Sequence, residues 1–512
     1  MKYFVIFISI LGSNLFAQKN TFDFKQKFDE LFTSYTSTKN YNPNLTYNPN
    51  WFYGWGFYLL SDIRMYEATG DYLNYLDPII TYSYEIQSKN KPTKKWYDEI
   101  PTSQLLSYSG QVLRPMAEFI MLVKKDTTLQ KRKISKSFFE EHKLLNQKID
   151  SNKMENYLDY CIWLEKEIVA DVDHLIEKHW LDFEKGFTKD FSGWSLSYKM
   201  PAELNIQAAW VPIFYCLYET TKNHNYYLER GNTISQLFKN QLSIYEIKNS
   251  NPRIQNYTWF HNLNLAKKGG DLLYREDVSH GAVDLYIPLY SYQISPTKVF
   301  NLLDLYRFNK TFTYNIYDRI NQTGFRNSVF GMNVPNLNKY QLPPQEFTIA
   351  TTTSEKVNVN LNDNFYSLGE ILPWISLFEF ESENDSLSIY SILVEQAQNL
   401  LENQAKYVPN KFPPNFKTDN LSGAQALYGL SEIVKAQWIK NGWSPNYCSI
   451  IQQKNEIENN TDLEESITLN NDSELIDLIG NRIYIPISNI QSGVYFQFNK
   501  EKETFKKIVL YK

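Results

Sequence analysis

Apolar residues recur at helical spacing through residues 51–76, WFYGWGFYLLSDIRMYEATGDYLNYL. The pattern breaks at Gly70 and then resumes, which predicts two helices joined by a short turn. Residues 210–231, WVPIFYCLYETTKNHNYYLERG, repeat this design, with Tyr227 in the place that Tyr75 occupies in the first copy. The sequence therefore predicts a recurring helical hairpin.

Weaker copies of the hairpin follow along the chain, at residues 282–308, 374–401 and 426–439. Hairpins that cannot bury their apolar faces alone must stack on neighbours, either as an open solenoid or as a closed ring of inner and outer helices. We expect the ring, so the predicted fold class is mainly α, an (α/α)n toroid of helical hairpins over residues 18–445. Long polar connections between the hairpins are expected to gather on one rim and build a cleft there.

The composition changes after the last hairpin. Residues 446–472 include the acidic, Asn-rich stretch NEIENNTDLEESITLNN, which is typical of a linker. Residues 473–512 alternate apolar and polar side chains, as two or three β-strands would. The sequence thus predicts a small C-terminal β module after the helical domain.

The start of the chain carries an export signal. Residues 1–17, MKYFVIFISILGSNLFA, combine one Lys, an apolar run and a final small residue, which predicts a secretory signal peptide cleaved before Gln18. No other segment has the ~18 consecutive apolar residues of a membrane-spanning helix. Cys161 and Cys216, two of three cysteines, lie within apolar helical patterns, so no disulfide framework is expected. We expect a secreted or cell-surface protein without a membrane span.

The charge of the chain is nearly balanced. Its 52 basic and 57 acidic side chains give a formal charge of −5, without the basic stripe that binds nucleic-acid phosphates. Aromatic residues make up 16% of the chain, and such rings serve both to pack helices and to stack on sugars. These features argue against a nucleic-acid partner and are compatible with a carbohydrate ligand.

The stretch YREDVSHGAVDLY, from Tyr274, places charged groups directly before an apolar helical pattern. Asp277 or Ser279 is suited to cap the helix, and His280 then falls in its first turn. The partial positive charge at a helix N-terminus disfavours imidazolium, so we expect a neutral His280 that is available as a base or hydrogen-bond donor. Asp284, one turn later on the same face, is placed to hold one ring nitrogen.

A purely structural interpretation of this stretch is also open. In it, Glu276 and Asp277 complement the helix dipole and His280 packs between helices. The surrounding residues make a functional interpretation as well supported as the structural one, because aromatic rings, a second imidazole and a cation occur within about 30 residues. These are Tyr257, Trp259, His261, Tyr274 and Arg275.

A second candidate lies in MPAELNIQAAW, where Asn205 and Gln207 begin the helix of the second hairpin. Amides at the entry of an inner helix can bind a carboxylate or sugar hydroxyls, yet capping explains Asn205 equally well. No zinc-type spacing, glycine-rich phosphate loop or nucleophile elbow is convincing, so no metal or other cofactor is predicted.

The end of the chain resembles a known export domain. GVYFQFN, a charged turn and the final KKIVLYK are similar to the C-terminal sorting domain of the type IX secretion system of Bacteroidetes. The resemblance covers roughly the last 40 residues. It implies that the type IX secretion machinery is a partner and carries the protein across the outer membrane.

The hairpins, the Asn205 entry and YREDVSHGAVDLY after YTWFHN resemble bacterial α/α-toroid proteins of polysaccharide breakdown, especially uronate-cleaving polysaccharide lyases. The resemblance covers roughly residues 40–440. It implies β-elimination on an acidic polysaccharide of the ulvan, alginate or glucuronan type. The reaction removes the proton next to a carboxylate whose charge has been neutralised, and then releases the 4-linked sugar.

The resemblance also implies roles for individual residues. His280 is expected as the base or carboxylate binder, and Tyr274 or Tyr257 as the proton donor. The groups expected to neutralise charge or position the substrate are Arg275, His261 and Asn205, and further substrate contacts are assigned to Trp259, Glu276 and Asp277. Many toroid lyases append a large β-sandwich that this chain does not have, which puts the lyase subclass in doubt.

Two alternatives remain open at the level of sequence. A glycoside hydrolase on the same helical ring needs two carboxylates in the cleft, and Glu276, Asp277 and Glu203 are available. A non-catalytic glycan-binding surface protein would hold sugar with its rings and amides alone. Fold does not fix function, so the choice depends on the chemistry of the site.

Overall fold

We describe the protein from a computed structural model. The described residues are 23–37, 49–87, 95–100, 105–134, 154–182, 186–187, 203–222, 224–246, 254–260, 276–317, 325, 328–329, 371–382, 387–407, 420–441, 473–477, 482–483, 493–499 and 504–510. Of these, 79% are helical, which confirms the predicted mainly-α class. The predicted signal peptide and linker lie outside the described residues.

The first predicted hairpin is present. Helix α3 (Pro49–Thr69) ends at Gly70, whose positive φ of 74° is a conformation that glycine adopts without steric cost. The Gly70 N–H donates to the Tyr66 carbonyl at 2.8 Å. Asp71 then caps α4 (Tyr72–Tyr75) by accepting from the Asn74 N–H, and α5 (Asp77–Gln87) follows. The turn predicted at Gly70 is therefore confirmed.

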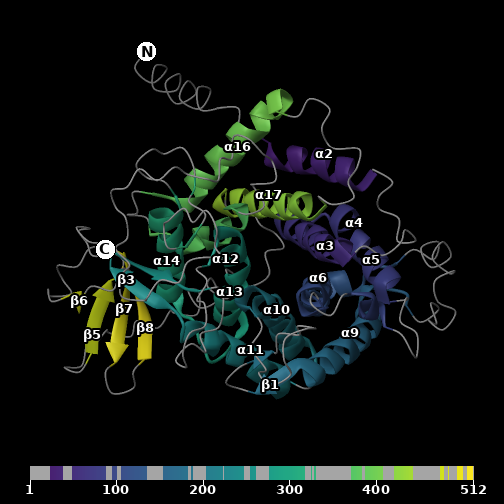
Figure 1. The fold of residues 1–512 in the computed structure, drawn as a ribbon, viewed down its shortest axis with the longest axis horizontal. Helices are drawn as coiled ribbons and strands as arrows, with labels where there is room; N and C mark the ends of the chain where they lie inside the picture. The colour runs from purple at the N-terminus through teal and green to yellow at the C-terminus, as the bar shows by residue number, and fades with distance from the viewer. Residues whose placement is uncertain are drawn as a thin grey trace, which may run out of the picture.

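Helices far apart in the sequence pack against each other (Figure 1). Helix α3 contacts α6 (Leu105–Lys125), and α6 contacts α10 (Leu204–Thr220). Helix α10 contacts α12 (Val278–Asp284) and α13 (Tyr286–Ile294), and α12 contacts the 3-10 helix η7 (Leu372–Phe380). Helix η7 packs on α17 (Asn420–Lys440), which lies along α3. The first and last of these helices are thus neighbours in space.

Three of these packed helices, α3, α6 and α10, run in the same direction. A Cβ on Gly56 of α3 would meet the Gln111 backbone of α6, and eight residues further along α3 the Arg64 guanidinium meets Glu118 of α6. Gly110 lies against Trp210 of α10, and the later pair Lys125 and Glu219 forms an ion pair between the same two helices. The N-terminal ends of α3, α6 and α10 therefore lie together.

Most of these helices are followed by a helix that packs beside them. The described pairs are α6 with α9 (Tyr157–His179), α10 with α11 (His224–Lys239), α13 with α14 (Leu302–Lys310) and η7 with α16 (Ile389–Tyr407), while α2 (Phe24–Ser37) packs on α17. The shorter elements are η1 (Trp96–Glu99), α7 (Thr127–Gln130) and the π-helix η4 (Thr311–Ile316). The α10–α11 pair confirms the second predicted hairpin.

The described residues form three small sheets beside the helices. Strands β1 (Trp180–Asp182) and β2 (Gly186–Phe187) pair antiparallel, as do β3 (Ser243–Glu246) and β4 (Gln255–Thr258). The C-terminal module is a four-stranded antiparallel sheet in the order β6-β5-β7-β8 (Figure 1). Its strands are β5 (Ser473–Asp477), β6 (Arg482–Ile483), β7 (Gly493–Asn499) and β8 (Thr504–Leu510). The β module is present with one or two strands more than expected.

Two further expectations concern cysteines and membranes. Cys161 and Cys216 are both buried free thiols, which confirms that neither belongs to a disulfide framework. Cys448 lies outside the described residues. Within the described ranges, every helix is too short or too polar to cross a bilayer.

The contact between α3 and α6 leads to the first prediction. A methyl group on Gly56 would lie 2.3 Å from the Gln111 carbonyl oxygen, so Gly56→Ala must push the two backbones apart. We expect a loss of about 1–3 kcal/mol in the free energy of unfolding. On an open helix the same change stabilises by about 1 kcal/mol, so the sign in a urea titration is decisive. Gln236→Ala on exposed α11 is the control, expected within about 0.5 kcal/mol of wild type.

Candidate active site at the start of α12

The capping predicted for the start of α12 is confirmed. Asp277 is the N-cap in an extended conformation, and its carboxylate accepts from the backbone N–H groups of Ser279 at 2.8 Å and His280 at 2.9 Å. The Ser279 hydroxyl donates to the same oxygen at 2.6 Å. Asp277, Ser279 and His280 therefore form one local unit that fixes the position of the His280 backbone.

His280 lies at the surface. Its side chain is 41% exposed, and its Nδ1 contacts the second carboxylate oxygen of Asp277. The structural alternative in which His280 packs between helices does not fit this exposure.

The charge of His280 differs from the expectation. Burial opposes the imidazolium form, but the hydrogen bond and the negative charge of Asp277 outweigh it and raise the pKa of His280 to about 9. Burial also opposes the Asp277 carboxylate, while His280 holds the pKa of Asp277 well below its usual range. The helix dipole was expected to keep His280 neutral. The nearby carboxylate is a full charge in direct contact, and therefore it decides the outcome.

Glu276 lies behind this pair. It is fully buried, and burial followed by the negative charge of Asp277 raises its pKa to about 8. Its backbone is fixed on both sides: its N–H donates to the Trp259 carbonyl, and its carbonyl accepts from Val329 N–H and the Ser328 hydroxyl. Direct substrate contact, predicted for Glu276, does not fit this burial. Glu276 instead supports Asp277: its side-chain oxygen Oε1 accepts a hydrogen bond from the Asp277 backbone N–H at 3.1 Å.

Tyr257 and Trp259 belong to the core. The Tyr257 hydroxyl donates to Asp304 at 2.6 Å and accepts from Arg307 at 3.2 Å, and burial raises its pKa above the usual range. Trp259 is fully buried and donates from Nε1 to Asp284 at 2.8 Å. Neither side chain is placed to contact a sugar as predicted. Asp284 accepts the hydrogen bond of Trp259. It was expected to contact a ring nitrogen of His280, but Nδ1 of His280 contacts Asp277 instead.

Asn205 sits on the neighbouring helix. It is the second residue of α10, whose N-cap is Glu203, so capping does not explain it. Its side-chain oxygen is buried and has no hydrogen-bond partner among the described residues. A buried acceptor without a partner costs about 1–3 kcal/mol, which is consistent with a position kept for ligand binding. Tyr274, Arg275 and His261 lie outside the described residues.

Glu276, Asp277 and His280 are the one group of possible metal ligands found within the described residues. Their ligand atoms lie within 4.8 Å of one another. A metal ion would require a deprotonated Glu276 and a neutral His280, whereas the raised pKa values of both groups favour the opposite forms near pH 7. A metal ion bound here at neutral pH would therefore have to displace a proton from each of these two groups.

The second prediction follows from this competition with protons. Treatment of the protein with EDTA at pH 7, followed by desalting, is expected to leave its melting temperature and its activity unchanged. Differential scanning fluorimetry and the elimination assay described below measure the two quantities. A loss that is restored by adding back a divalent cation would contradict this expectation and favour a metal centre.

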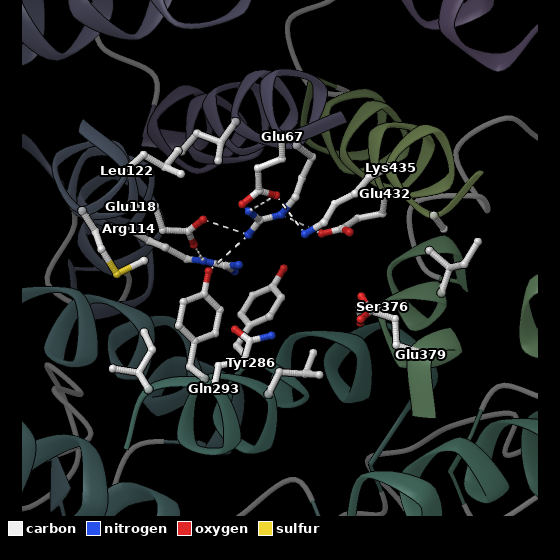
Figure 2. A pocket seen from close by; sticks show the side chains of 18 of the residues that line it. Glu67, Arg114, Glu118, Leu122, Tyr286, Gln293, Ser376, Glu379, Glu432 and Lys435 are labelled. Carbon is white, nitrogen blue, oxygen red and sulfur yellow. Dashed lines mark hydrogen bonds and ion pairs between the residues drawn. The ribbon is translucent and has the colours of Figure 1, made fainter. Parts of the chain in front are cut away.

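A cavity that was not predicted lies among the helices (Figure 2). Its volume is about 190 Å³, and residues of α3, α6, α10, α13, η7 and α17 line it. Five basic residues line the cavity: Arg64, Arg114, Lys125, Lys298 and Lys435. Five acidic residues also line it: Glu67, Glu118, Glu219, Glu379 and Glu432. No local motif marks these positions, because the charged residues are spread over five helices and one connection, with at most three on any one helix.

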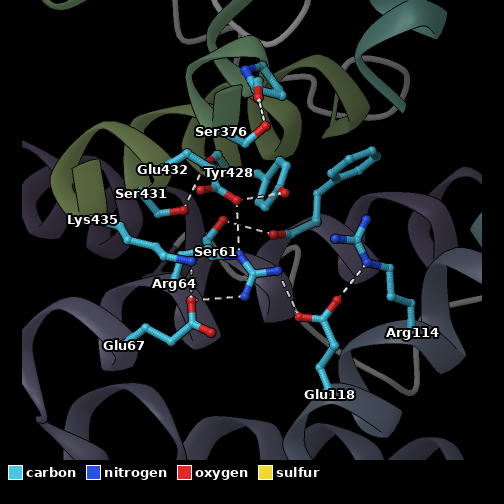
Figure 3. A network of polar contacts seen from close by, with 12 residues as sticks. Ser61, Arg64, Glu67, Arg114, Glu118, Ser376, Tyr428, Ser431, Glu432 and Lys435 are labelled. Carbon is cyan, nitrogen blue, oxygen red and sulfur yellow. Dashed lines mark hydrogen bonds and ion pairs between the residues drawn. The ribbon is translucent and has the colours of Figure 1, made fainter. Parts of the chain in front are cut away.

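Arg64 is the centre of the charged network in this cavity (Figure 3). Its guanidinium binds Glu67 at 3.0 Å, Glu118 at 2.8 Å and Glu432 at 2.9 Å, and it donates to the Tyr290 hydroxyl at 3.1 Å. All of these side chains are at least nine-tenths buried. The network thus ties α3, α6, α13 and α17 together. Such buried pairs hold one another in place rather than leaving a charge available for catalysis.

The geometry supports a half-exposed His280–Asp277 pair as the reactive part of the α12 site. An imidazolium held by a carboxylate can neutralise an anionic group or donate a proton. Comparison of the chain with models of protein families, with curated proteins and with solved structures found no match.

Proposed function

We propose that this chain is a secreted lyase that cleaves a uronic-acid-containing polysaccharide by β-elimination. The observation that carries the proposal is the half-exposed His280, held as imidazolium by Asp277 at the start of α12. A positive charge at the surface of a rigid helix end is suited to bind the carboxylate of an acidic sugar. In that role it makes the proton next to the carboxylate easier to remove.

The proposed architecture is an (α/α) toroid. Its inner helices would be α3, α6, α10, α12 with α13, η7 and α17, and its outer helices would be their sequence partners. The contact of α17 with both η7 and α3 supports this arrangement, as does the common direction of α3, α6 and α10. The long connections then enter at the N-terminal ends of the inner helices. His280 and Asn205 lie at those ends, on two helices that pack together.

The residues act in sequence in the proposed reaction. The His280 imidazolium pairs with the substrate carboxylate, and the Asn205 side chain at the start of α10 positions the sugar. Tyr274 is proposed to move the proton, removing it next to the carboxylate and returning it to the leaving oxygen. Arg275 and His261 are proposed as additional cationic contacts. These last three assignments rest on the sequence resemblance, since the residues lie outside the described part of the chain.

A hydrolase is less well supported by the site. A retaining glycosidase needs two carboxyl groups about 5–5.5 Å apart that both face the sugar, and an inverting one needs a larger separation. The ligand atoms of Glu276 and Asp277 lie within 4.8 Å, and Glu276 is fully buried. The raised pKa of Glu276 would suit a general acid, but its burial keeps the carboxyl group away from a glycosidic oxygen. The lyase therefore remains the preferred function.

The test is an assay of the purified mature chain on ulvan, alginate and glucuronan. A lyase creates a C4–C5 double bond, which is expected to appear as absorbance near 235 nm together with new reducing ends. Reducing ends without this absorbance would identify a hydrolase. Binding in affinity electrophoresis with neither signal would identify a non-catalytic glycan binder.

The third prediction concerns pH. Because the pKa of His280 is raised to about 9, the imidazolium form is populated at neutral pH and is lost as the pH rises through about 9. We therefore expect kcat/KM to fall across this range, while circular dichroism verifies that the fold is retained. An increase of kcat/KM through the same range would show that neutral His280 acts as the base and would contradict the carboxylate-binding role.

We also propose that the chain is exported through the signal peptide at residues 1–17 and the β module at residues 473–512. The module has the antiparallel β7–β8 hairpin at its end, in the segment that resembles type IX sorting domains. Removal of residues 473–512 is expected to trap the protein in the periplasm of its host, as measured by cell fractionation. Unchanged appearance at the cell surface or in the medium would reject the sorting role.

A further inference from the structure

The cavity lies away from the candidate active site. Tyr286, the lining residue nearest to His280 in the sequence, belongs to the separate helix α13, and neither His280 nor Asp277 lines the cavity. It faces the C-terminal halves of the helices, where the connections to the next helix are short. Its volume of about 190 Å³ exceeds the ~150 Å³ of a cavity that accommodates benzene. One six-membered ring with its substituents therefore fits.

One donor in the cavity wall has no acceptor. Arg114 is 1% exposed, and its Nε donates to Glu118 at 2.7 Å. Its guanidinium lies 3.5 Å above the ring of Tyr286, which fixes its plane. Its Nη1 is buried and has no hydrogen-bond partner among the described residues. A buried charged donor is costly when left unsatisfied, so an oxygen acceptor from outside the protein would stabilise it.

The charges around the cavity restrict what can bind. The five basic and five acidic residues that line it balance to zero. Arg64 and Lys435 are paired with buried carboxylates, and Lys125 is paired with Glu219. An anionic or cationic ligand would disturb these pairs or bring in a charge without a counter-ion. Hydroxyl groups both donate and accept hydrogen bonds. They can therefore bind to basic and acidic side chains without bringing a further charge into the cavity.

Aromatic side chains complete the match. Tyr286, Tyr290 and Tyr428 line the cavity together with Phe378 and Phe380. The aromatic rings can pack on the apolar C–H faces of a sugar, and the charged groups beside them can bind its hydroxyl groups. We infer that this cavity is a second ligand site, which binds one neutral, monosaccharide-sized polyol independently of the His280 site. This inference does not depend on the proposed lyase activity.

The experiment is isothermal titration of the full mature chain with four probes. They are methyl glucoside and methyl xyloside as neutral sugars, glucuronate as an anion and glucosamine as a cation. We expect one saturable site for at least one neutral glycoside, with affinity at least tenfold higher than for either charged sugar. Tighter binding of a charged sugar, or no binding of any neutral one, would overturn the inference.

Variants locate the site. Gln293 and Ser376 border the cavity (Figure 2). Gln293→Trp, or Ser376→Phe as an independent filling variant, is expected to lower the affinity at least tenfold with an unchanged circular dichroism spectrum. Gln236→Trp on exposed α11 is the matched control and is expected to bind as wild type. His280→Ala is also expected to bind normally; loss of binding there would place the sugar at the α12 site instead and reject the second site.

Discussion

His280→Ala is expected to lower kcat/KM for the uronate polymer by about 10²–10³-fold, the usual effect of removing one charge-stabilising group from an active site. The reason is that the imidazolium supplies the positive charge that the substrate carboxylate needs when its neighbouring proton is removed. The 235 nm assay measures the rate. Because the side chain is 41% exposed, its loss leaves no cavity in the core.

The fold of the variant is expected to be retained. Asp277 still accepts from the backbone N–H groups at the start of α12, so the loss in unfolding free energy should not exceed the about 1.5–3 kcal/mol of one charge-assisted hydrogen bond. His174→Ala is the matched control, because this exposed imidazole on α9 stacks on Tyr97 and belongs to no charged group of the site. Full activity of His280→Ala, or collapse of its fold, would remove His280 from the active site.

Arg64→Met is expected to destabilise the protein by about 3–5 kcal/mol, because removing one partner of a buried ionic network leaves the others without their counter-charge. In this variant Glu118 keeps its ion pair with Arg114, and Glu67 keeps its ion pair with Lys435. Glu432 loses its ion pair and keeps the hydrogen bond from Tyr428. The midpoint and slope of a urea titration measure the loss.

A double-mutant cycle isolates the network energy. Arg64→Met combined with Glu432→Gln removes the charge that the single change strands, so the double variant should be more stable than Arg64→Met alone. Lys25→Met breaks an ion pair with Asp29 whose partners are both half-buried, and it should cost at most about 1 kcal/mol. An Arg64→Met variant as mild as Lys25→Met would mean that the network contributes little to holding the four helices together.

The two sites differ in how far they are visible in the sequence. The cluster at residues 276–280 is contiguous, and its capping bonds span only two or three residues. The cavity was missed because its central contacts join positions 368, 226 and 54 residues apart. Glu67 and Glu118 resemble ordinary charges on amphipathic helices. The helical pattern alone carries no sign that they meet at one arginine.

The sequence by itself determined the recurring hairpins, the turn at Gly70, the cap at Asp277 and the β module, since each depends on periodicity or on neighbours within a few residues. The tertiary structure decided what long-range contacts and burial control. The predicted sugar contact of Trp259 is wrong because its side chain is packed into the core, where it donates a hydrogen bond to Asp284. The charge of His280 was decided by which carboxylate reached its ring, since direct contact with Asp277 outweighs the helix dipole.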